Sequence, residues 1–185
     1  MKKLLALLLA VVMVLGLAAC GGGEGSNTLT IGTAQDINNL NPQMQNDQIN
    51  NNAITLSHQG LIYLKNPAEQ ASTGSVYGPM IAKSWEWEDD NTLVFHLFEG
   101  VKFSDGSACT AEDCVFTYEM AMSPESNTSG SLGLLTGVEA RDELTFVIKT
   151  SSYSNDLMSA LSTKPLVIQS KDAYEDPNNK EPWTG

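Results

Sequence analysis

Residues 84–98 read SWEWEDDNTLVFHLF, and this stretch decides the fold. Its first part alternates aromatic and polar side chains, which places Trp85 and Trp87 on one face of a strand and the carboxylates on the other. The run over 92–98 is largely apolar, as expected for a buried strand. Because the polar residues 89–91 separate the two runs, the stretch predicts a β-hairpin.

A second hairpin and a helix are predicted on its C-terminal side. Residues 138–140 and 144–148 form two strand-like runs around a turn at 142–143. Between the hairpins, Thr110 and Asp113 have the spacing of a capping box, with Asp in place of the usual Glu. The apolar residues of this helix recur at i, i+4, i+7 and i+11 and predict one buried face: Ala111, Val115, Tyr118 and Met122.

Shorter helices and strands are expected before, between and after the two hairpins. The β-branched alternation of residues 28–33 predicts a strand, and the pattern after Asp47 predicts a helix of about ten residues that Asp47 caps. Residues 66–78, with Pro, Ser and Gly, are expected to form a loop, and the polar stretch 126–133 is expected to be an exposed loop. The remaining predictions are strands over 61–64 and 166–168 and helices over 155–161 and 171–174. No internal repeat is visible, and this order indicates a mixed fold, α+β or α/β.

The charge balance excludes one class of partner. The chain of 185 residues has 22 Asp+Glu against 10 Lys+Arg and a formal charge of -12. A nucleic-acid interface needs clustered Lys and Arg, so no nucleic acid is expected to bind. An anionic membrane surface would repel such a chain. With 42% hydrophobic and 17% charged residues, the composition is that of an ordinary globular protein.

The N-terminus has the three parts of an export signal. Two lysines precede sixteen uncharged residues, and Cys20 follows with three glycines. Residues 17–20, Leu-Ala-Ala-Cys, resemble a bacterial lipobox, in which the Cys thiol is acylated and the chain is cut before it. The alternative is an ordinary signal peptide with an incidental cysteine. We expect removal of residues 1–19, a lipid on Cys20 and a flexible tether over 20–27. The expected location is the outer face of the cell membrane, or the periplasm.

The sequence contains no recognisable catalytic or metal-binding constellation. His58 and His96 are the only histidines and have no partner at a metal-ligand spacing; His96 is expected to be paired or surface-facing within its strand. Cys109 and Cys114 are expected to be buried thiols, with a disulfide between them as the alternative. No nucleophile elbow, P-loop or dinucleotide fingerprint occurs. We therefore expect no enzyme, no cofactor and no directly bound metal.

Three segments around the first hairpin carry a family resemblance. They are PMIAKSWEW at 79–87, GVKFSDG at 100–106 and TAEDCVF at 110–116. Together they resemble the signature of the extracellular solute-binding proteins of family 5. Leu-Asn-Pro at 40–42 and the remaining order of elements agree, so the resemblance runs from about residue 29 to 185.

The resemblance implies a fold and a division of the chain. Family members are receptors of ABC importers for oligopeptides, dipeptides, nickel complexes and related solutes, with two lobes that close on the solute. The implied fold is mixed α/β, of the periplasmic-binding-protein class II. Members are several times longer than one such subdomain, so a truncated chain is expected. Residues 28–52 would begin the ligand-binding lobe, and residues 53–185 would form the peripheral subdomain.

The resemblance also suggests which residues face the ligand. The loop that precedes Leu-Asn-Pro supplies four candidates, and the end of the next helix supplies two weaker ones. The candidates are Gln35, Asp36, Asn38 and Asn39, then His58 and Gln59. Asp36 would meet the ammonium group or a basic side chain of a peptide, or else it caps a turn.

The expected function is capture of a solute outside the cell. We predict a lipid-anchored, monomeric substrate-binding protein that binds oligo- or dipeptides and delivers them to an ABC permease and ATPase complex. A nickel or metal-chelate receptor of the same family is the first alternative. A stand-alone cell-envelope lipoprotein is the second, and an exported hydrolase is a more distant one.

Overall fold

The computed structural model describes residues 29–37, 39–44, 47–162 and 166–179. The chain divides into two units, residues 1–34 and 35–185. The predicted signal peptide over 1–19, the lipid site Cys20 and the tether over 20–27 lie outside the described residues. The helices and strands of the described residues all belong to the larger unit.

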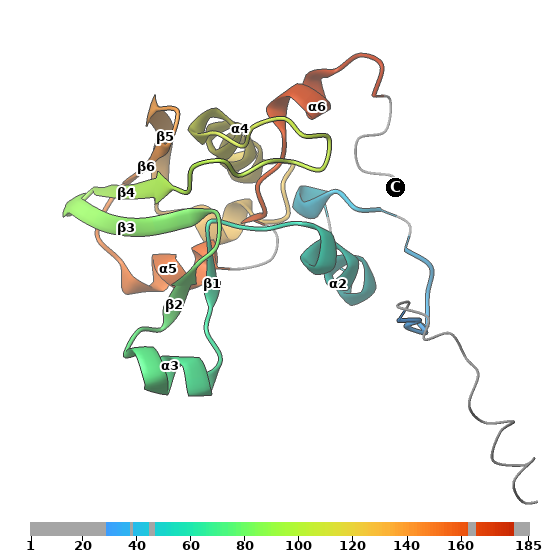
Figure 1. Cartoon of the computed structure of the whole chain (residues 1–185). Coiled ribbons are helices and arrows are strands. Elements are labelled where there is room, and N and C mark those ends of the chain that lie inside the picture. Colours follow the sequence, from blue (N-terminus) through green and yellow to red (C-terminus); the bar gives the residue numbers. More distant parts are fainter. Residues whose placement is uncertain (1–28, 38, 45–46, 163–165, 180–185) are drawn as a thin grey trace, which may run out of the picture. The chain divides into compact units, whose positions relative to one another are not determined.

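The larger unit is built on a four-stranded antiparallel sheet whose strand order is β3-β4-β6-β5 (Figure 1). Each predicted hairpin is confirmed, and the two hairpins join side by side through β4 and β6. At that junction Phe95 lies opposite Phe146, with ring centroids 6.3 Å apart. The four strands are β3 (Ala82–Asp89), β4 (Thr92–Leu97), β5 (Leu135–Asp142) and β6 (Thr145–Thr150).

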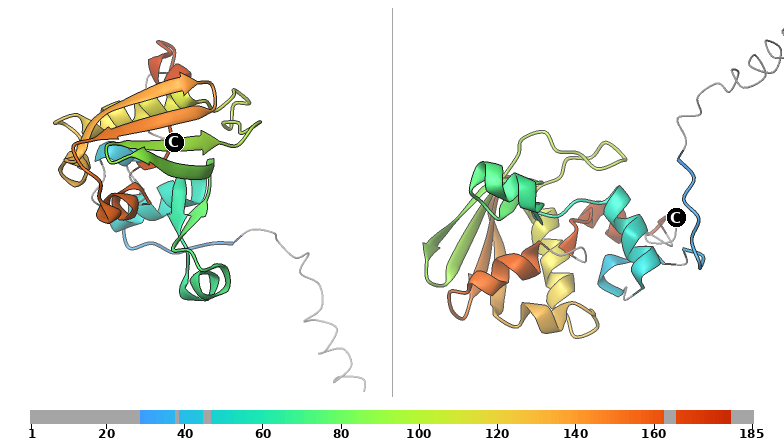
Figure 2. Two further views of the ribbon diagram at one scale, coloured as in Figure 1. Left: turned by 90° about the vertical axis from the view of Figure 1, so that its left-hand side faces the viewer. Right: turned by 90° about the horizontal axis from the view of Figure 1, so that it is seen from below.

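Helix α4 (Ala111–Met122) lies along one face of this sheet (Figure 2). The capping box is confirmed, because the Thr110 backbone N–H donates to Asp113 Oδ2 at 2.9 Å. Tyr118 is fully buried against Phe146, with ring centroids 5.1 Å apart. The predicted buried face was partly wrong: Val115 and Met122 are only half-buried, since the sheet covers the side at i, i+3, i+7 and i+10. That side is formed by Ala111, Cys114, Tyr118 and Ala121.

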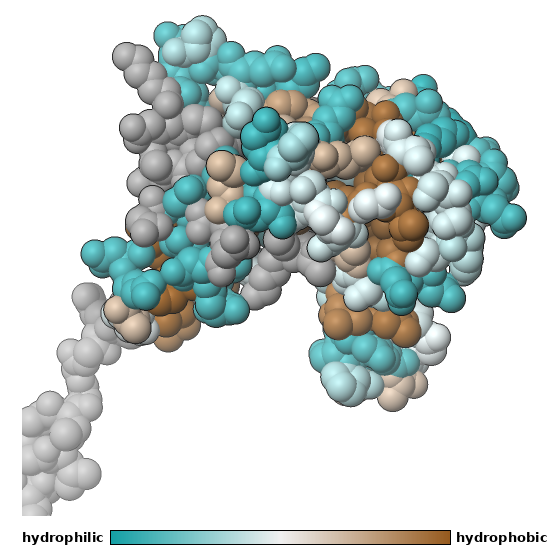
Figure 3. All heavy atoms as spheres, turned by 180° about the vertical axis from the view of Figure 1, so that it is seen from behind, coloured by the Kyte–Doolittle hydropathy of each residue, from teal (hydrophilic) through white to brown (hydrophobic). Residues whose placement is uncertain are grey.

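A two-stranded ribbon extends from the sheet and carries a helix that the sequence did not predict. Strands β1 (Ile62–Leu64) and β2 (Tyr77–Pro79) pair antiparallel, and α3 (Pro67–Thr73) connects them. The prediction of a loop over 66–78 was therefore wrong. Asn66 accepts bonds from two backbone N–H groups while Glu69 accepts one from Asn66, so a capping box starts the helix despite its Ser, Thr and Pro content. Figure 3 shows a hydrophobic band across this ribbon.

Three further helices lie where the sequence predicts them. They are α2 (Gln48–Ser57), α5 (Asn155–Leu161) and α6 (Lys171–Glu175). Asp47 caps α2 as expected, with Oδ1 accepting from the Ile49 N–H at 2.8 Å. Serine hydroxyls cap the other two helices.

The expected exposed loop over 126–133 instead packs into the fold. It contains a short 3-10 helix, η2 (Ser129–Leu132), and Ser126, Thr128 and Leu132 are buried. The two hydroxyls are buried because both donate to the side-chain oxygen of Gln43, which follows the Leu-Asn-Pro segment in η1 (Pro42–Met44). The hydroxyl groups of Ser126, Thr128 and Ser129 thus form hydrogen bonds within the protein.

Two predicted strands are not formed. Residues 29–33 are extended without strand pairing, and Leu29 and Ile31 are 82% and 63% exposed. Residues 166–168 contribute only one bridge, between Val167 and Gly60. Neither segment belongs to a sheet of the described residues, and the contact of residues 166–168 with Gln59 and Gly60 is too short to make a strand.

Candidate functional site

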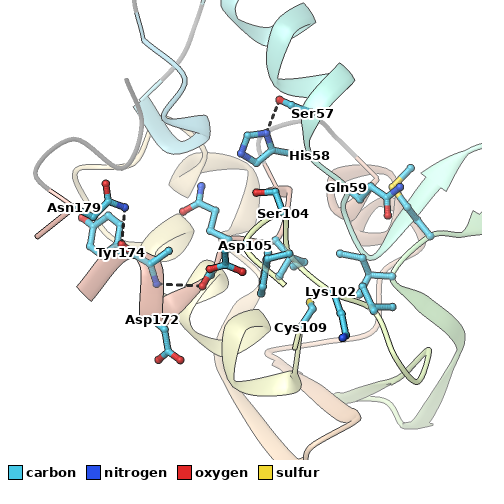
Figure 4. A pocket seen from close by; sticks show the side chains of 18 of the residues that line it. Ser57, His58, Gln59, Lys102, Ser104, Asp105, Cys109, Asp172, Tyr174 and Asn179 are labelled. Carbon is cyan, nitrogen blue, oxygen red and sulfur yellow. Dashed lines mark hydrogen bonds between the residues drawn. The ribbon is translucent and has the colours of Figure 1, made fainter. Parts of the chain in front are cut away.

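The larger unit contains a cavity of about 1050 Å³ (Figure 4). It lies between the end of α2, the start of β3, the 101–109 segment and α6. Its floor is made of buried residues: Ile81, Cys109, Ile168 and Gln169. Figure 4 shows His58 on one side and Asp172 and Tyr174 of α6 on another. The cavity therefore combines an apolar floor with a polar rim, as ligand sites do.

Backbone and side-chain bonds fix the floor segment. The Ile168 N–H donates to the Gln59 carbonyl at 2.8 Å, and the Gln169 N–H donates to Thr117 Oγ1 of α4 at 2.9 Å. The Lys171 N–H donates to Asp113 Oδ1 at 2.9 Å, so one buried carboxylate holds the starts of both α4 and α6. The position of the cavity floor thus depends on α4 and through it on the sheet.

Gln169 is a cavity residue that was not among the sequence candidates. It is only 2% exposed, yet among the described residues neither Oε1 nor Nε2 of its side chain has a hydrogen-bond partner. The available signal was a single Gln directly after the apolar run 166–168, at a position where a polar side chain is unfavourable unless paired.

His58 is the weaker sequence candidate that the structure places in the cavity, together with Gln59. Its Nδ1 lies 2.8 Å from Ser57 Oγ, and its backbone N–H donates to the Ile54 carbonyl (Figure 4). Burial lowers the pKa of the imidazole, and a hydrogen bond between the ring and the Ile54 backbone opposes this shift in part. At neutral pH the ring is therefore uncharged and can both donate and accept a hydrogen bond.

The rim is predominantly acidic. Among the described residues that line the cavity, three are aspartates, Asp105, Asp172 and Asp176, and one is a lysine, Lys102. Asp105 accepts bonds from the Ser107 hydroxyl at 2.6 Å and its N–H at 2.8 Å, which lower the pKa of the carboxyl group. These exposed carboxylates favour a ligand that carries a positive charge.

The two thiols near the cavity are not reactive groups. Cys109 and Cys114 are buried and free, which confirms the prediction of thiols rather than a disulfide. Desolvation, with the neighbouring Asp113 carboxylate, raises the pKa of the Cys109 thiol to about 12. The pKa of Cys114 is raised by burial and by the neighbouring Cys109 and Asp113. Both stay protonated at neutral pH and act as small apolar side chains.

The loop candidates lie outside this cavity. Gln35 and Asp36 are exposed, Asn39 is half-buried, and Asn38 falls outside the described residues. Asn39 Oδ1 accepts from the Asn41 N–H at 2.8 Å. Nothing in the structure tests whether these residues bind a ligand, so they stay predictions.

A buried polar cluster fixes the segment that follows these candidates. Gln43 Oε1 accepts from Ser126 Oγ at 3.2 Å and from Thr128 Oγ1 at 3.0 Å. The Asn127 N–H donates to the Gln43 carbonyl at 2.9 Å, and Asn41 Oδ1 accepts from the Gln43 N–H at 2.9 Å. The loop with the predicted ligand residues is thereby tied to the turn after α4.

Metal ligands and membrane spans do not occur in the described ranges. They contain no group of three or more His, Cys, Asp or Glu residues placed to hold a metal ion. Within the same ranges, no helix combines the length and the apolar character required to cross a membrane.

Comparison with known proteins defines the class of protein. Residues 76–185 match the family model of the bacterial extracellular solute-binding proteins, family 5 Middle. The chain belongs to this family, in agreement with the resemblance seen in its sequence.

Individual relatives agree with this assignment. The oligopeptide-binding protein OppA of Bacillus subtilis is 30% identical over 146 residues, which are 71% of this chain and 26% of that protein. Protein XP55 of Streptomyces lividans is 29% identical over 188 aligned positions, covering 94% of this chain and 33% of that protein. The chain thus spans about a quarter to a third of the length of these relatives.

A solved structure shows the same fold. The binding protein MoaA of A. tumefaciens R10, in complex with mannopinic acid, superposes with a TM-score of 0.67 at 24% identity. The match covers 79% of this chain and 30% of MoaA. The mixed α/β fold is therefore that of part of a periplasmic binding protein.

Proposed function

We propose that this chain belongs to the solute-binding component of an ABC importer, which captures peptides outside the cell and delivers them to the permease. The match of residues 76–185 to family 5 carries the proposal. The OppA relative, named as an oligopeptide-binding protein, supports the choice of peptides. Residues 28–52 would begin the ligand-binding lobe and residues 53–185 would form the peripheral subdomain.

The transport function is tested by gene deletion in the source organism. Cells without the encoding gene are expected to lose most of their uptake of radiolabelled trialanine, and a plasmid copy of the gene is expected to restore it. Uptake of free alanine serves as the control, because a defect confined to the peptide excludes a general loss of energy for transport. Unchanged trialanine uptake after deletion would contradict the proposal.

Anchoring through Cys20 is proposed as part of the same function. The residues Leu-Ala-Ala-Cys at 17–20 support it, since acylation would hold the receptor beside its permease. Metabolic labelling with an alkyne fatty acid is expected to mark the wild-type chain and not Cys20→Ala. Label that persists in the variant would contradict the assignment of this cysteine.

A further inference from the structure

We infer that Asn127 is a glycosylation site, at which an oligosaccharide from a lipid-linked pyrophosphate donor is joined to the side-chain nitrogen before the surrounding turn folds. The inference goes beyond the proposed function and needs only that the chain is exported, as its N-terminus predicts. Three observations carry it: the sequence around Asn127, the exposure of its side chain, and the internal hydrogen bonds of its neighbours.

The first observation is the sequence Glu-Ser-Asn-Thr-Ser over residues 125–129, which follows α4. An asparagine followed by any residue except proline, and then by serine or threonine, is the acceptor pattern of N-linked glycosylation. Asn127 is the one asparagine of the sequence that satisfies it, because Ser129 stands at the third position. Glu125 is exposed beside the acceptor, and its carboxylate offers a transferase a charged contact.

The second observation is that Asn127 is exposed while both its neighbours are buried. Ser126 and Thr128 are 6% and 8% exposed. The Asn127 backbone N–H donates to the Gln43 carbonyl at 2.9 Å, but among the described residues its side-chain amide has no hydrogen bond. The amide nitrogen is therefore free to be modified, and a sugar attached to it extends into solvent without displacing a packed side chain.

The third observation is that the hydroxyl group required by the pattern is already bonded in the folded chain. Ser129 is half-buried, and its Oγ donates to the Ser126 carbonyl at 2.9 Å. Gln43 in turn accepts from the hydroxyls of Ser126 and Thr128. A transferase that binds the Ser129 hydroxyl must break these bonds and open the turn. In the unfolded chain no such bonds oppose it, so the modification precedes folding of the turn.

The transfer is a substitution at the first carbon of the donor sugar. Nδ2 of Asn127 attacks this carbon, the bond from the carbon to the pyrophosphate oxygen breaks, and the lipid pyrophosphate leaves. The nitrogen keeps one of its two protons and releases the other to solvent. An N-glycosidic bond thus replaces the glycosyl phosphate bond, no atom is oxidised or reduced, and the lipid-linked sugar is the only co-substrate.

The first test is mass spectrometry of the protein purified from the source organism. Trypsin cuts after Lys102 and Arg141, and the peptide 103–141 is expected to carry a sugar on Asn127. Asn127→Gln is expected to carry none. Ser129→Ala is expected to lower the glycosylated fraction at least tenfold, whereas Ser129→Thr is expected to retain it, because threonine also satisfies the pattern.

The matched control is Ser131→Ala. Ser131 is exposed beyond the pattern, and its backbone N–H donates to the Thr128 carbonyl, a bond that does not depend on the Ser131 side chain. This variant is expected to keep its glycan. Glu125→Gln is expected to lower the glycosylated fraction at least threefold, because it removes the charged contact.

The second test concerns the order of folding and modification. The full chain is made without glycan in a host that lacks the transferase, and the folded protein is incubated with membranes of the source organism that hold transferase and donor. The wild-type chain is expected to gain little sugar. Gln43→Leu is expected to gain at least threefold more, because it removes the acceptor that holds the turn closed. Gln48→Leu, exposed on α2, is expected to behave as the wild type.

Three results would overturn the inference. They are a peptide 103–141 from the source organism that is entirely free of sugar, a glycan that persists in Ser129→Ala, and rapid modification of the folded wild-type chain at the rate of Gln43→Leu.

Uptake separates this failure from that of the proposed function. Residues 125–129, all of them described, do not line the cavity, so Asn127→Gln is expected to restore trialanine uptake in full to cells that lack the gene. A sugar-free peptide from cells whose uptake depends on the gene would overturn the inference alone. A glycosylated peptide from an organism in which deletion leaves uptake unchanged would overturn the function alone.

Discussion

The protonation state of the buried thiols is fixed by individual residues around them. Cys109 and Cys114 lie beside the Asp113 carboxylate in an apolar setting, and both pKa values are raised. At pH 8 we expect iodoacetamide to leave both thiols unmodified in the native protein and to modify both in guanidinium chloride. Mass spectrometry of proteolytic peptides distinguishes them from Cys20. Rapid alkylation of Cys109 in the native state would contradict this expectation.

His58 gives the stability of the protein a predictable dependence on pH. Burial holds the pKa of the folded imidazole below its ordinary value of about 6.5. Below that pH the unfolded chain binds the proton more readily than the folded one, so protonation favours unfolding. The contribution of His58 to stability is thus fully present above pH 6.5 and is lost as the pH falls toward the folded-state value.

Urea unfolding at pH 7.5 and pH 5.5 measures this effect. The free energy of unfolding is expected to fall less between these two pH values in His58→Gln than in the wild type, because the glutamine does not titrate. Equal losses in the two proteins would mean that His58 is equally accessible to protons in both states.

The structural role of a residue can be predicted from sequence where that role depends only on residues nearby in the chain. Asp47 and the pair Thr110 and Asp113 were recognised because a helix cap needs only the residues beside it. Gln169 was not recognised, because it packs beside residues far away in sequence, such as Thr117, which accepts its backbone N–H from 52 positions away. No local pattern records such a contact.

At the scale of elements, the Gln43 cluster holds two loops together. Gln43 is 3% exposed and is the acceptor for the hydroxyls of Ser126 and Thr128. The substitution Gln43→Leu removes the acceptor of both hydroxyl groups. It is expected to lower the free energy of unfolding by about 1–3 kcal/mol. Hydrogen exchange is expected to accelerate in residues 39–44 and 126–132 before the sheet is affected.

The matched control for this variant is Gln48→Leu. Gln48 is exposed on α2, and its amide donates to Asn52 Oδ1, four residues on, so we expect a change below about 0.5 kcal/mol. If the free energy of unfolding falls equally in both leucine variants, or if hydrogen exchange accelerates uniformly over the chain, the Gln43 cluster does not specifically hold these two loops together.

Sequence analysis misassigned the elements whose amino-acid composition does not match the hydrogen bonds that they form. Helix α3 has the Ser, Thr and Pro content of a loop, but the Asn66 and Glu69 capping box is enough to start it. Residues 29–33 have the composition of a strand and form none, because pairing depends on a neighbour that no sequence pattern specifies.

For the whole molecule, the mixed fold was predictable but the arrangement of its sheet was not. The two hairpins follow from local alternation and turn residues. Their union through β4 and β6 brings together Phe95 and Phe146, about fifty positions apart, and the sequence offers no turn or spacing that specifies it. The family resemblance supplied the architecture that local patterns did not.

That union places Phe146 where the two hairpins meet α4. It is fully buried and contacts Phe95 of the sheet and Tyr118 of α4. Phe146→Ala leaves a cavity at this junction and is expected to lower the free energy of unfolding by about 3–5 kcal/mol. This is a large share of the roughly 5–15 kcal/mol that stabilises a domain of ordinary size.

Phe98→Ala is the control, because Phe98 follows β4 and is 43% exposed. This substitution is expected to lower the free energy of unfolding by less than about 1 kcal/mol. Urea unfolding followed by tryptophan fluorescence and by circular dichroism is expected to give coincident transitions in the wild type and in both variants, since Trp85 and Trp87 pack on the same core. Separate transitions in Phe146→Ala would mean that sheet and helix unfold independently, and that the junction does not couple them.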